Sequence, residues 1–195
     1  TQHKLLAHVL ISERRYVIIN KKRKNDERIV RLSIKIRGGD KMQMTYQQAG
    51  LATTITYGEI LTSSIQPAMY QDKAVIVITN QRYYDHFFEK IQGVFAETTV
   101  DWYICRNQLY ANTLDEWMGL LDYLERFSTQ KEYLIIAIGN VGVVELTGFL
   151  QKVSLLKSTF WVIPVSFQSY AQALVAARTI CRQPSLAILK QLKAD

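Results

Sequence analysis

The chain has 195 residues, of which 48% are hydrophobic and 21% are charged, and its formal net charge is +7. This composition fits a folded domain with a sizeable core and argues against an intrinsically disordered chain. No stretch approaches the eighteen or so apolar residues that a membrane span needs, and the first residues do not resemble a secretion signal.

The positive charge is concentrated in the first part of the chain. Residues 1–73 hold 13 Lys and Arg against 6 Asp and Glu, whereas residues 74–195 hold 11 of each. This asymmetry predicts a boundary at residue 73, between a basic first segment and a neutral second domain.

Four short segments of the first part predict a small antiparallel sheet. Residues 28–37 alternate between apolar and polar side chains, which is typical of a half-exposed strand. A turn at 38–40 and a second alternating run over 42–46 then predict a hairpin. The two other strand candidates are residues 15–19 and 53–57.

The basic run Lys21-Lys22-Arg23-Lys24 lies between two of these strand candidates. It is expected to form a solvated polar loop together with the polar residues that follow it. Nucleic acid is not expected as a partner, because interleaved aromatic residues and a known binding motif are missing.

Strands and helices alternate in the second part. Short β-branched runs at 74–79, 100–105, 133–138 and 159–163 predict buried parallel strands. Apolar residues at helical spacing follow each strand, over 82–95, 114–127, 143–153 and from 169 into an Ala-rich helical tail that breaks at Pro184. The alternation predicts an α/β fold: a Rossmann-like, mainly parallel sheet with helices on both faces. Ligands of such sheets bind outside the carboxyl ends of the strands.

Three runs at fixed spacing carry a family resemblance. Residues 137–149 read A-I-G-N-V-G-V-V-E-L-T-G-F, residues 163–167 read I-P-V-S-F, and residues 172–178 read Q-A-L-V-A-A-R. Upstream, residues 77–80 read V-I-T-N at the end of the first parallel strand. These runs resemble the NAD-binding half of the dehydroquinate synthase family, in which the first run is close to A-L-G-G-G-V-V-G-D-L-A-G-F. The family's R-S-Y-x-I-x-I-G strand corresponds to residues 14–19 or to 54–58.

The resemblance implies a fold, a chemistry and a set of contacts. Dehydroquinate synthases bind NAD in this half and zinc in a following helical half, and they cyclise a seven-carbon keto-acid phosphate to 3-dehydroquinate. The zinc ligands have no counterpart before Asp195, so zinc is not expected in this chain. The cofactor-binding positions that the resemblance implies are Thr79, Asn80, Gly139, Gly142, Glu145, Ser166 and Arg178.

The glycine turn departs from the family's pattern. Only Gly139 remains of a glycine triplet, because Asn140 and Val141 replace the next two, and Val144 replaces the glycine before the acidic residue. A β-branched Val does not readily adopt a positive φ, and its Cβ would crowd a phosphate. The turn therefore favours a structural role, in which Gly139 ends a strand, over a competent NAD site.

Other functional positions also differ from the family. The family's G-E-x-x-K loop aligns with residues 108–112, which contain neither Glu nor Lys. Gln172 stands in place of an Asp and cannot ionise, so no catalytic residue is expected in this chain. Ser166 is expected as a helix N-cap, Glu145 as a solvated first-turn carboxylate or a helix-dipole partner, and Arg178 as an exposed or phosphate-ready cation.

Cys105 and Cys181 lie in apolar stretches without a Cys/His spacing that suits zinc, which predicts buried reduced thiols and a cytoplasmic protein.

Three functions fit these observations. The first is a dehydroquinate-synthase-like protein without catalysis, which acts as a structural, regulatory or partner-binding module, with a protein partner or a second copy of itself. The second is the NAD-binding half of a synthase or related sugar-phosphate cyclase, a phosphate-eliminating lyase, whose metal half lies past Asp195 or on another chain. The third is a binder of a different nucleotide or small molecule.

Overall fold

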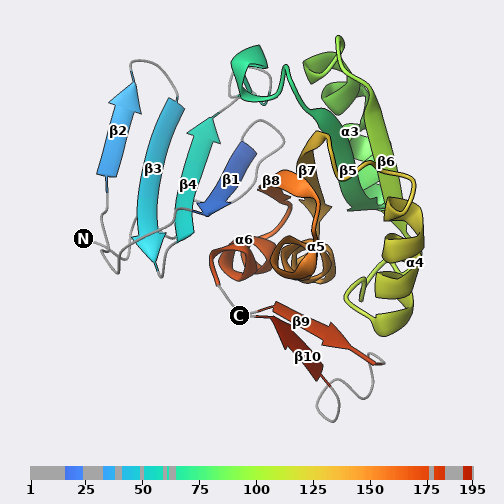
Figure 1. The fold of residues 1–195 in the computed structure, drawn as a ribbon. Coiled ribbons are helices and arrows are strands. Elements are labelled where there is room, and N and C mark those ends of the chain that lie inside the picture. Colours follow the sequence, from blue (N-terminus) through green and yellow to red (C-terminus); the bar gives the residue numbers. More distant parts are fainter. Residues whose placement is uncertain are drawn as a thin grey trace.

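The computed structural model describes residues 16–23, 33–37, 41–48, 51–58, 61, 65–175, 178–182 and 191–194. Eight strands form one sheet in the order β2-β3-β4-β1-β8-β7-β5-β6, and two further strands, β9 and β10, pair with each other (Figure 1). The large sheet has an antiparallel half and a parallel half, which meet where β1 pairs with β8.

The parallel half confirms the four strands predicted from β-branched runs. Its strands are β5 (Ala74–Asn80), β6 (Val100–Cys105), β7 (Glu132–Gly139) and β8 (Lys157–Pro164). All three pairings among them are parallel. Every residue of β7 after Glu132 is buried, as expected for a central strand that is covered on both faces.

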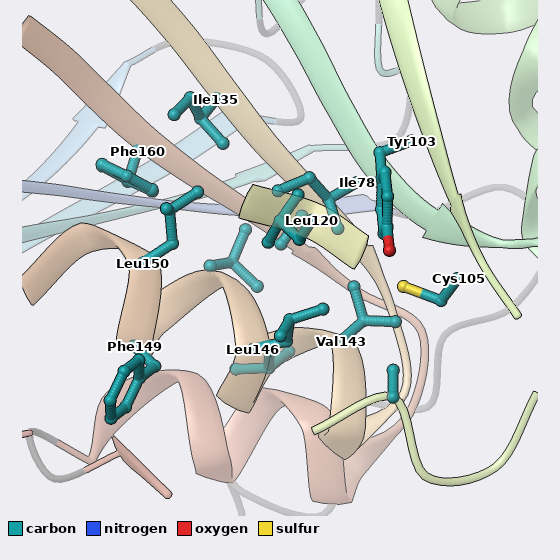
Figure 2. Close-up of a cluster of buried hydrophobic side chains, with 14 of the residues drawn as sticks. Ile78, Tyr103, Cys105, Leu120, Ile135, Val143, Leu146, Phe149, Leu150 and Phe160 are labelled. Carbon is teal, nitrogen blue, oxygen red and sulfur yellow. The ribbon is translucent and has the colours of Figure 1, made fainter. Parts of the chain in front are cut away.

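Helices cover both faces of the parallel half, as the alternation predicts. Helix α3 (Gln81–Val94) packs on one face, where its Phe87 and Ile91 join an apolar cluster with Val75 and Val77. The other face carries α4 (Leu114–Leu124), α5 (Val141–Val153) and α6 (Phe167–Leu174). Figure 2 shows part of this second cluster, in which side chains of α4 and α5 meet Ile78 and Cys105.

The antiparallel half contains β1 (Tyr16–Arg23), β2 (Ser33–Arg37), β3 (Lys41–Gln48) and β4 (Leu51–Gly58). The predicted hairpin is confirmed as the β2–β3 pair. These strands extend the parallel sheet edge to edge through β1 and β8. A short 3-10 helix (Pro67–Met69) precedes β5.

The prediction of a basic loop is wrong for Lys21, Lys22 and Arg23. These residues continue β1, and each pairs with a residue of β4. The physical reason is that β4 offers a partner strand long enough to pair with all of β1, which outweighs the weak strand propensity of a charged run. Lys24 and residues 28–32 of the predicted second strand lie outside the described residues.

The prediction of a helical tail is also wrong beyond α6. Strand β9 (Arg178–Cys181) pairs antiparallel with β10 (Gln191–Ala194). Backbone groups of β9 bond to the core, since Cys181 N donates to Asn112 O at 2.8 Å and Ile180 is buried. Tertiary bonding of this kind overrides the helix propensity of an Ala-rich run. The predicted break at Pro184 lies outside the described residues.

Within the described ranges, no helix combines the length and the apolar character needed to cross a membrane.

Candidate functional site

The carboxyl ends of β5 and β7 form the topological switch point of the parallel sheet. The chain passes from β5 to β6 on one side and then returns to β7 on the other side of β5. Ligands of open α/β sheets bind at such a point. Thr79 and Asn80 end β5, Gly139 ends β7, and Gly142 lies in the first turn of α5. Four of the predicted cofactor residues are therefore brought to one edge.

A segment that we call the covering loop, residues 106–112, runs from β6 across this edge. The side-chain amide of Asn80 donates a hydrogen bond to the carbonyl of Asn107 at 2.9 Å. The amide of Asn140 donates to the carbonyls of Gln108 and Leu109 at 2.9 and 3.3 Å. Two polar side chains at the ends of β5 and β7 thus hold the loop over the switch point.

Glu116 of α4 holds the start of the covering loop. Its carboxylate is buried and accepts hydrogen bonds from Arg106 N at 2.9 Å, Asn107 N at 3.3 Å and the Tyr103 hydroxyl at 2.7 Å. Burial, and then this bond to Glu116, raises the pKa of Tyr103 well above its usual range. Within the loop, the side chain of Asn107 accepts from Leu109 N and Tyr110 N. The loop is therefore fixed at both ends and along its length.

Two glycines among the predicted cofactor-binding positions, Gly139 and Gly142, lie in close contact with other parts of the protein. A Cβ added to Gly142 would lie 2.6 Å from Ala111 N, in the covering loop. A Cβ added to Gly139 would lie 2.7 Å from Cγ2 of Val143. Val143 points into the apolar cluster beside Cys105 (Figure 2). Both positions require glycine because of protein contacts, and a phosphate is not needed to explain either one.

The N-terminus of α5 is capped by its own flanking residue. Asn140 is the N-cap, and its side-chain oxygen accepts a hydrogen bond from Val143 N at 3.3 Å. A helix N-terminus is the part of a Rossmann-like sheet that binds a pyrophosphate, through its free N–H groups and its dipole. Here the cap and the covering loop occupy that position.

Glu145 and Arg178 form a second cluster, between α5, α6 and β9. Glu145 is buried, and its carboxylate accepts from the side-chain amide of Gln172 and from Thr179 N. Arg178 is 3% exposed and donates to the carbonyls of Val175 and Ala173 at the end of α6. The predictions of a solvated Glu145 and an exposed Arg178 are wrong, because β9 folds back onto α5 and covers both.

Ser166 takes the structural role that was expected of it. It is the N-cap of α6, where its hydroxyl accepts from Ser169 N at 3.1 Å and forms a capping box with Ser169. It follows β8, so it lies one strand away from the β5–β7 switch point. The predicted residues therefore divide among the switch point, the α5–α6–β9 cluster and this cap.

Sequence reasoning missed the residues that hold the covering loop, above all Glu116. The available signal was Thr-x-x-Glu at 113–116, the pattern of a capping box. Thr113 does cap α4, since its hydroxyl accepts from Glu116 N at 3.3 Å, but the Glu116 carboxylate turns to the loop instead. The predicted burial of both free thiols is confirmed, and burial raises the pKa of Cys105 well above its usual range.

Neither the known protein families nor the curated proteins with which the chain was compared give a match. The fold is a Rossmann-like parallel α/β sheet with an antiparallel extension. Among the described residues, no three His, Cys, Asp or Glu side chains gather in a way that could hold a metal ion.

Proposed function

We propose that the chain is a divergent dehydroquinate-synthase-like protein that lacks catalysis of its own and acts as a structural, regulatory or partner-binding module. The alternation of strands and helices, and the spacing of the motif runs between Val77 and Arg178, support the resemblance. Function, however, depends on the residues of the site rather than on the fold that carries them.

One observation carries the proposal: the covering loop lies on the edge where a dinucleotide would bind. Asn80 and Asn140 bond to its carbonyls, and Ala111 packs where a side chain on Gly142 would lie. A ligand at this edge would have to break these contacts, and leaving the buried side-chain amide of Asn80 unpaired would cost about 1–3 kcal/mol.

The positions that correspond to the family's substrate side support the same conclusion. General acid–base chemistry needs an ionisable group within reach of the substrate. Gln172 cannot ionise and bonds to Glu145, while Arg178 is buried against the end of α6. These side chains stabilise the packing of β9 on α5 and α6, and they present no free charge to a phosphorylated sugar acid.

Apolar side chains around the carboxyl edge support the partner-binding role. Leu109 and Tyr110 of the covering loop are 70% and 52% exposed, and Phe167 at the start of α6 is 55% exposed. Hydrogen bonds fix the backbone of the covering loop, so docking on Leu109 and Tyr110 would lose little conformational entropy.

The test is a calorimetric titration of the chain with NAD, together with a sedimentation measurement of its oligomeric state. We expect no saturable heat, and we expect no phosphate release from the seven-carbon substrate. The variant Gly142→Ala is the matched probe, since its Cβ would displace Ala111 of the covering loop without adding a charge. Saturable NAD binding by the unmodified chain would overturn the proposal.

A second candidate function is the NAD-binding half of a cyclase whose metal half is supplied elsewhere. One observation favours it: Asn80 is 1% exposed, and its side-chain oxygen has no hydrogen-bond partner among the described residues. A ribose hydroxyl is a donor that this acceptor could use. If this candidate is right, NAD binds in the same titration and Asn80→Ala weakens it at least tenfold.

A further inference from the structure

Strand β6 ends the eight-stranded sheet on the side opposite to β2 (Figure 1). Among the strands that the structure describes, only β5 pairs with β6. The backbone N–H and C=O groups on the outer side of β6 therefore have no partner strand within the described part of the chain. Such an edge is a template on which another extended chain can pair.

The open side of β6 is reflected in its burial. Four of its six residues are half-buried, whereas every residue of β5 except the first is buried. On one face of β6, the Trp102 ring packs edge-on against Tyr84 of α3. On the other face, the Tyr103 ring packs against Tyr123 of α4. Because helices cover both faces, the exposure of β6 lies along its outer edge.

Strand β6 lacks the features by which edge strands avoid pairing, which are lysines, prolines and bulges. Its sequence is V-D-W-Y-I-C, and it runs in register with β5 over six residues without a bulge. Its one charged side chain, Asp101, accepts a hydrogen bond from Arg126 at 3.1 Å. The opposite edge strand, β2, contains Lys35 and Arg37. Of the two edges of the sheet, β6 is therefore the one suited to pairing.

A strand that pairs with β6 has to match both of its faces. Val100, Trp102 and Ile104 lie on the face that α3 covers, where Trp102 also packs against Phe88. Asp101 lies on the other face, where an acidic residue directly opposite would repel it. The partner strand therefore needs apolar side chains on the α3 face and no acidic side chain opposite Asp101.

We propose that the partner is a second copy of this chain, and that the two β6 strands pair antiparallel across a two-fold axis at Trp102. A two-fold interface must be self-complementary, and an axis perpendicular to the sheet brings only residues of the same face opposite each other. Val100 then lies opposite Ile104 of the second copy. Asp101 lies opposite Tyr103 of the second copy. Every pair on the α3 face is apolar, and no acidic residue lies opposite another.

Other positions of the axis fit β6 less well. An axis at Asp101 would place the two Asp101 carboxylates opposite each other. An axis at Tyr103 would bring Val100 opposite Arg106, whose backbone N–H already donates to Glu116 at 2.9 Å. Axes nearer the ends of the strand pair fewer residues. This interface is separate from the covering loop, and it does not depend on whether the chain binds NAD.

The first test is an interchain disulfide in the double variant Val100→Cys/Ile104→Cys. The proposed register places each new cysteine opposite one of the second copy, within the Cα separation of about 4–7 Å that a disulfide needs. We expect mild oxidation to give a dimer on a non-reducing gel. The two native thiols are buried, so they do not interfere.

Each single variant is a matched control for the double variant. In the proposed register, residue 100 of one copy lies four residues from residue 100 of the other, about 13 Å along the strand. The same holds for residue 104, so neither Val100→Cys nor Ile104→Cys should form a dimer. Equal cross-linking by a single variant, or none by the double variant, would overturn the proposal.

The second test is sedimentation equilibrium over a range of protein concentrations. We expect the unmodified chain to show a monomer–dimer equilibrium. Ile104→Lys should lower the association constant at least tenfold, because it places a charge opposite Val100 on an apolar face. Leu155→Lys is the matched control, since Leu155 is 89% exposed and lies before β8, and it should retain the association constant. A monomeric parent chain would overturn the proposal.

The covering loop is the competing place for a dimer contact. Leu109→Ser/Tyr110→Ser removes its exposed apolar side chains and should leave the association constant unchanged. Dissociation of this variant, with Ile104→Lys still dimeric, would place the contact on the loop and overturn the proposal. Circular dichroism checks that each variant is folded, and if Ile104→Lys is not, the cross-linking result decides.

Discussion

The two halves of the eight-stranded sheet differ in what their strands pack against. In the parallel half, α3 covers one face and α4, α5 and α6 cover the other, so β5 and β7 are apolar almost without interruption. In the antiparallel half, polar and apolar positions alternate along β2, where Ser33, Lys35 and Arg37 share one face and Ile34 and Ile36 the other. The comparison teaches that one continuous sheet contains two kinds of strand: the parallel half forms most of the apolar core, and β4 of the antiparallel half adds Ile55 to it.

The halves also differ in how their polar groups are used. At the carboxyl edge of the parallel half, Asn80, Asn140 and Glu116 are all bonded to the covering loop. In the antiparallel half, Thr45 and Thr54 bond to each other across the strands. The first arrangement occupies the usual ligand edge, and the second links two neighbouring strands.

The largest expected effect tests the difference in burial. Ile136 in the middle of β7 is fully buried, so Ile136→Ala should destabilise the chain by about 3–5 kcal/mol through lost burial and a residual cavity. Thr45→Ala in β3 removes one cross-strand hydroxyl contact and should cost at most about 1 kcal/mol. Urea denaturation of both variants measures the two values. Equal costs would contradict the view that the core lies in the parallel half.

Sequence reasoning recovered the parallel half better than the rest, for a physical reason. Strands buried on both faces are continuous apolar runs, and residues 74–79 and 133–138 are of this kind. Strand β1 was predicted only over its first half and β9 was predicted as helix, because their pairing depends on partners far along the chain. Lys21 pairs with Thr53, and Thr179 N bonds to Glu145. Such long-range bonds leave no local pattern in the residues themselves.

For the candidate site, the sequence predicted which positions come together but not how the protein itself covers them. The motif spacing located Thr79, Asn80, Gly139 and Gly142, which the fold brings together at one edge. The burial of Arg178 and the closure of the edge by residues 106–112 could not be inferred, because both depend on loops that fold across other elements. Loop residues follow no periodic pattern, so the sequence does not indicate to which carbonyl the side chain of a loop Gln or Asn will donate a hydrogen bond.

A smaller difference in stability is expected between alanine variants of two glycines, one in α5 and one in α3. A Cβ on Gly148 would lie 2.0 Å from Nε of the buried Arg178, so Gly148→Ala should destabilise the chain by about 1–3 kcal/mol. Gly93 in α3 has no atom within 4 Å of its Cβ position, and Gly93→Ala should stabilise by about 0.5–1 kcal/mol. Thermal denaturation of the pair gives the comparison. Stabilisation by both variants would show that Arg178 is not held against α5.

Alkaline pH should weaken the parallel half through Cys105. Burial raises the pKa of this thiol, so the folded chain keeps it neutral while the unfolded chain ionises it. A group with a raised pKa contributes full stability below its unfolded pKa, about 8.5, and loses it as the pH rises, at about 1.4 kcal/mol per pH unit. Denaturation between pH 7.5 and 9.5 should therefore show a smaller decline in Cys105→Ala than in the parent chain. Tyr110→Phe, a change on an exposed loop side chain, is the control, and identical slopes in all three proteins would contradict the assignment.

The last prediction concerns Asn140, whose side chain both caps a helix and holds the covering loop. Its oxygen caps α5 and its amide holds the covering loop, so Asn140→Ala should cost about 1–2 kcal/mol. Asn140→Asp keeps an acceptor for the cap, and its negative charge suits a helix N-terminus, but it removes the donor to Gln108 and Leu109. We expect Asn140→Asp to recover most of the lost stability, while amide hydrogen exchange in the covering loop rises as much as in Asn140→Ala. If exchange in the loop stayed at the parent level in Asn140→Asp, Glu116 and Asn80 alone would be sufficient to hold the loop, and the carboxyl edge would be closed from the β5–β6 side only.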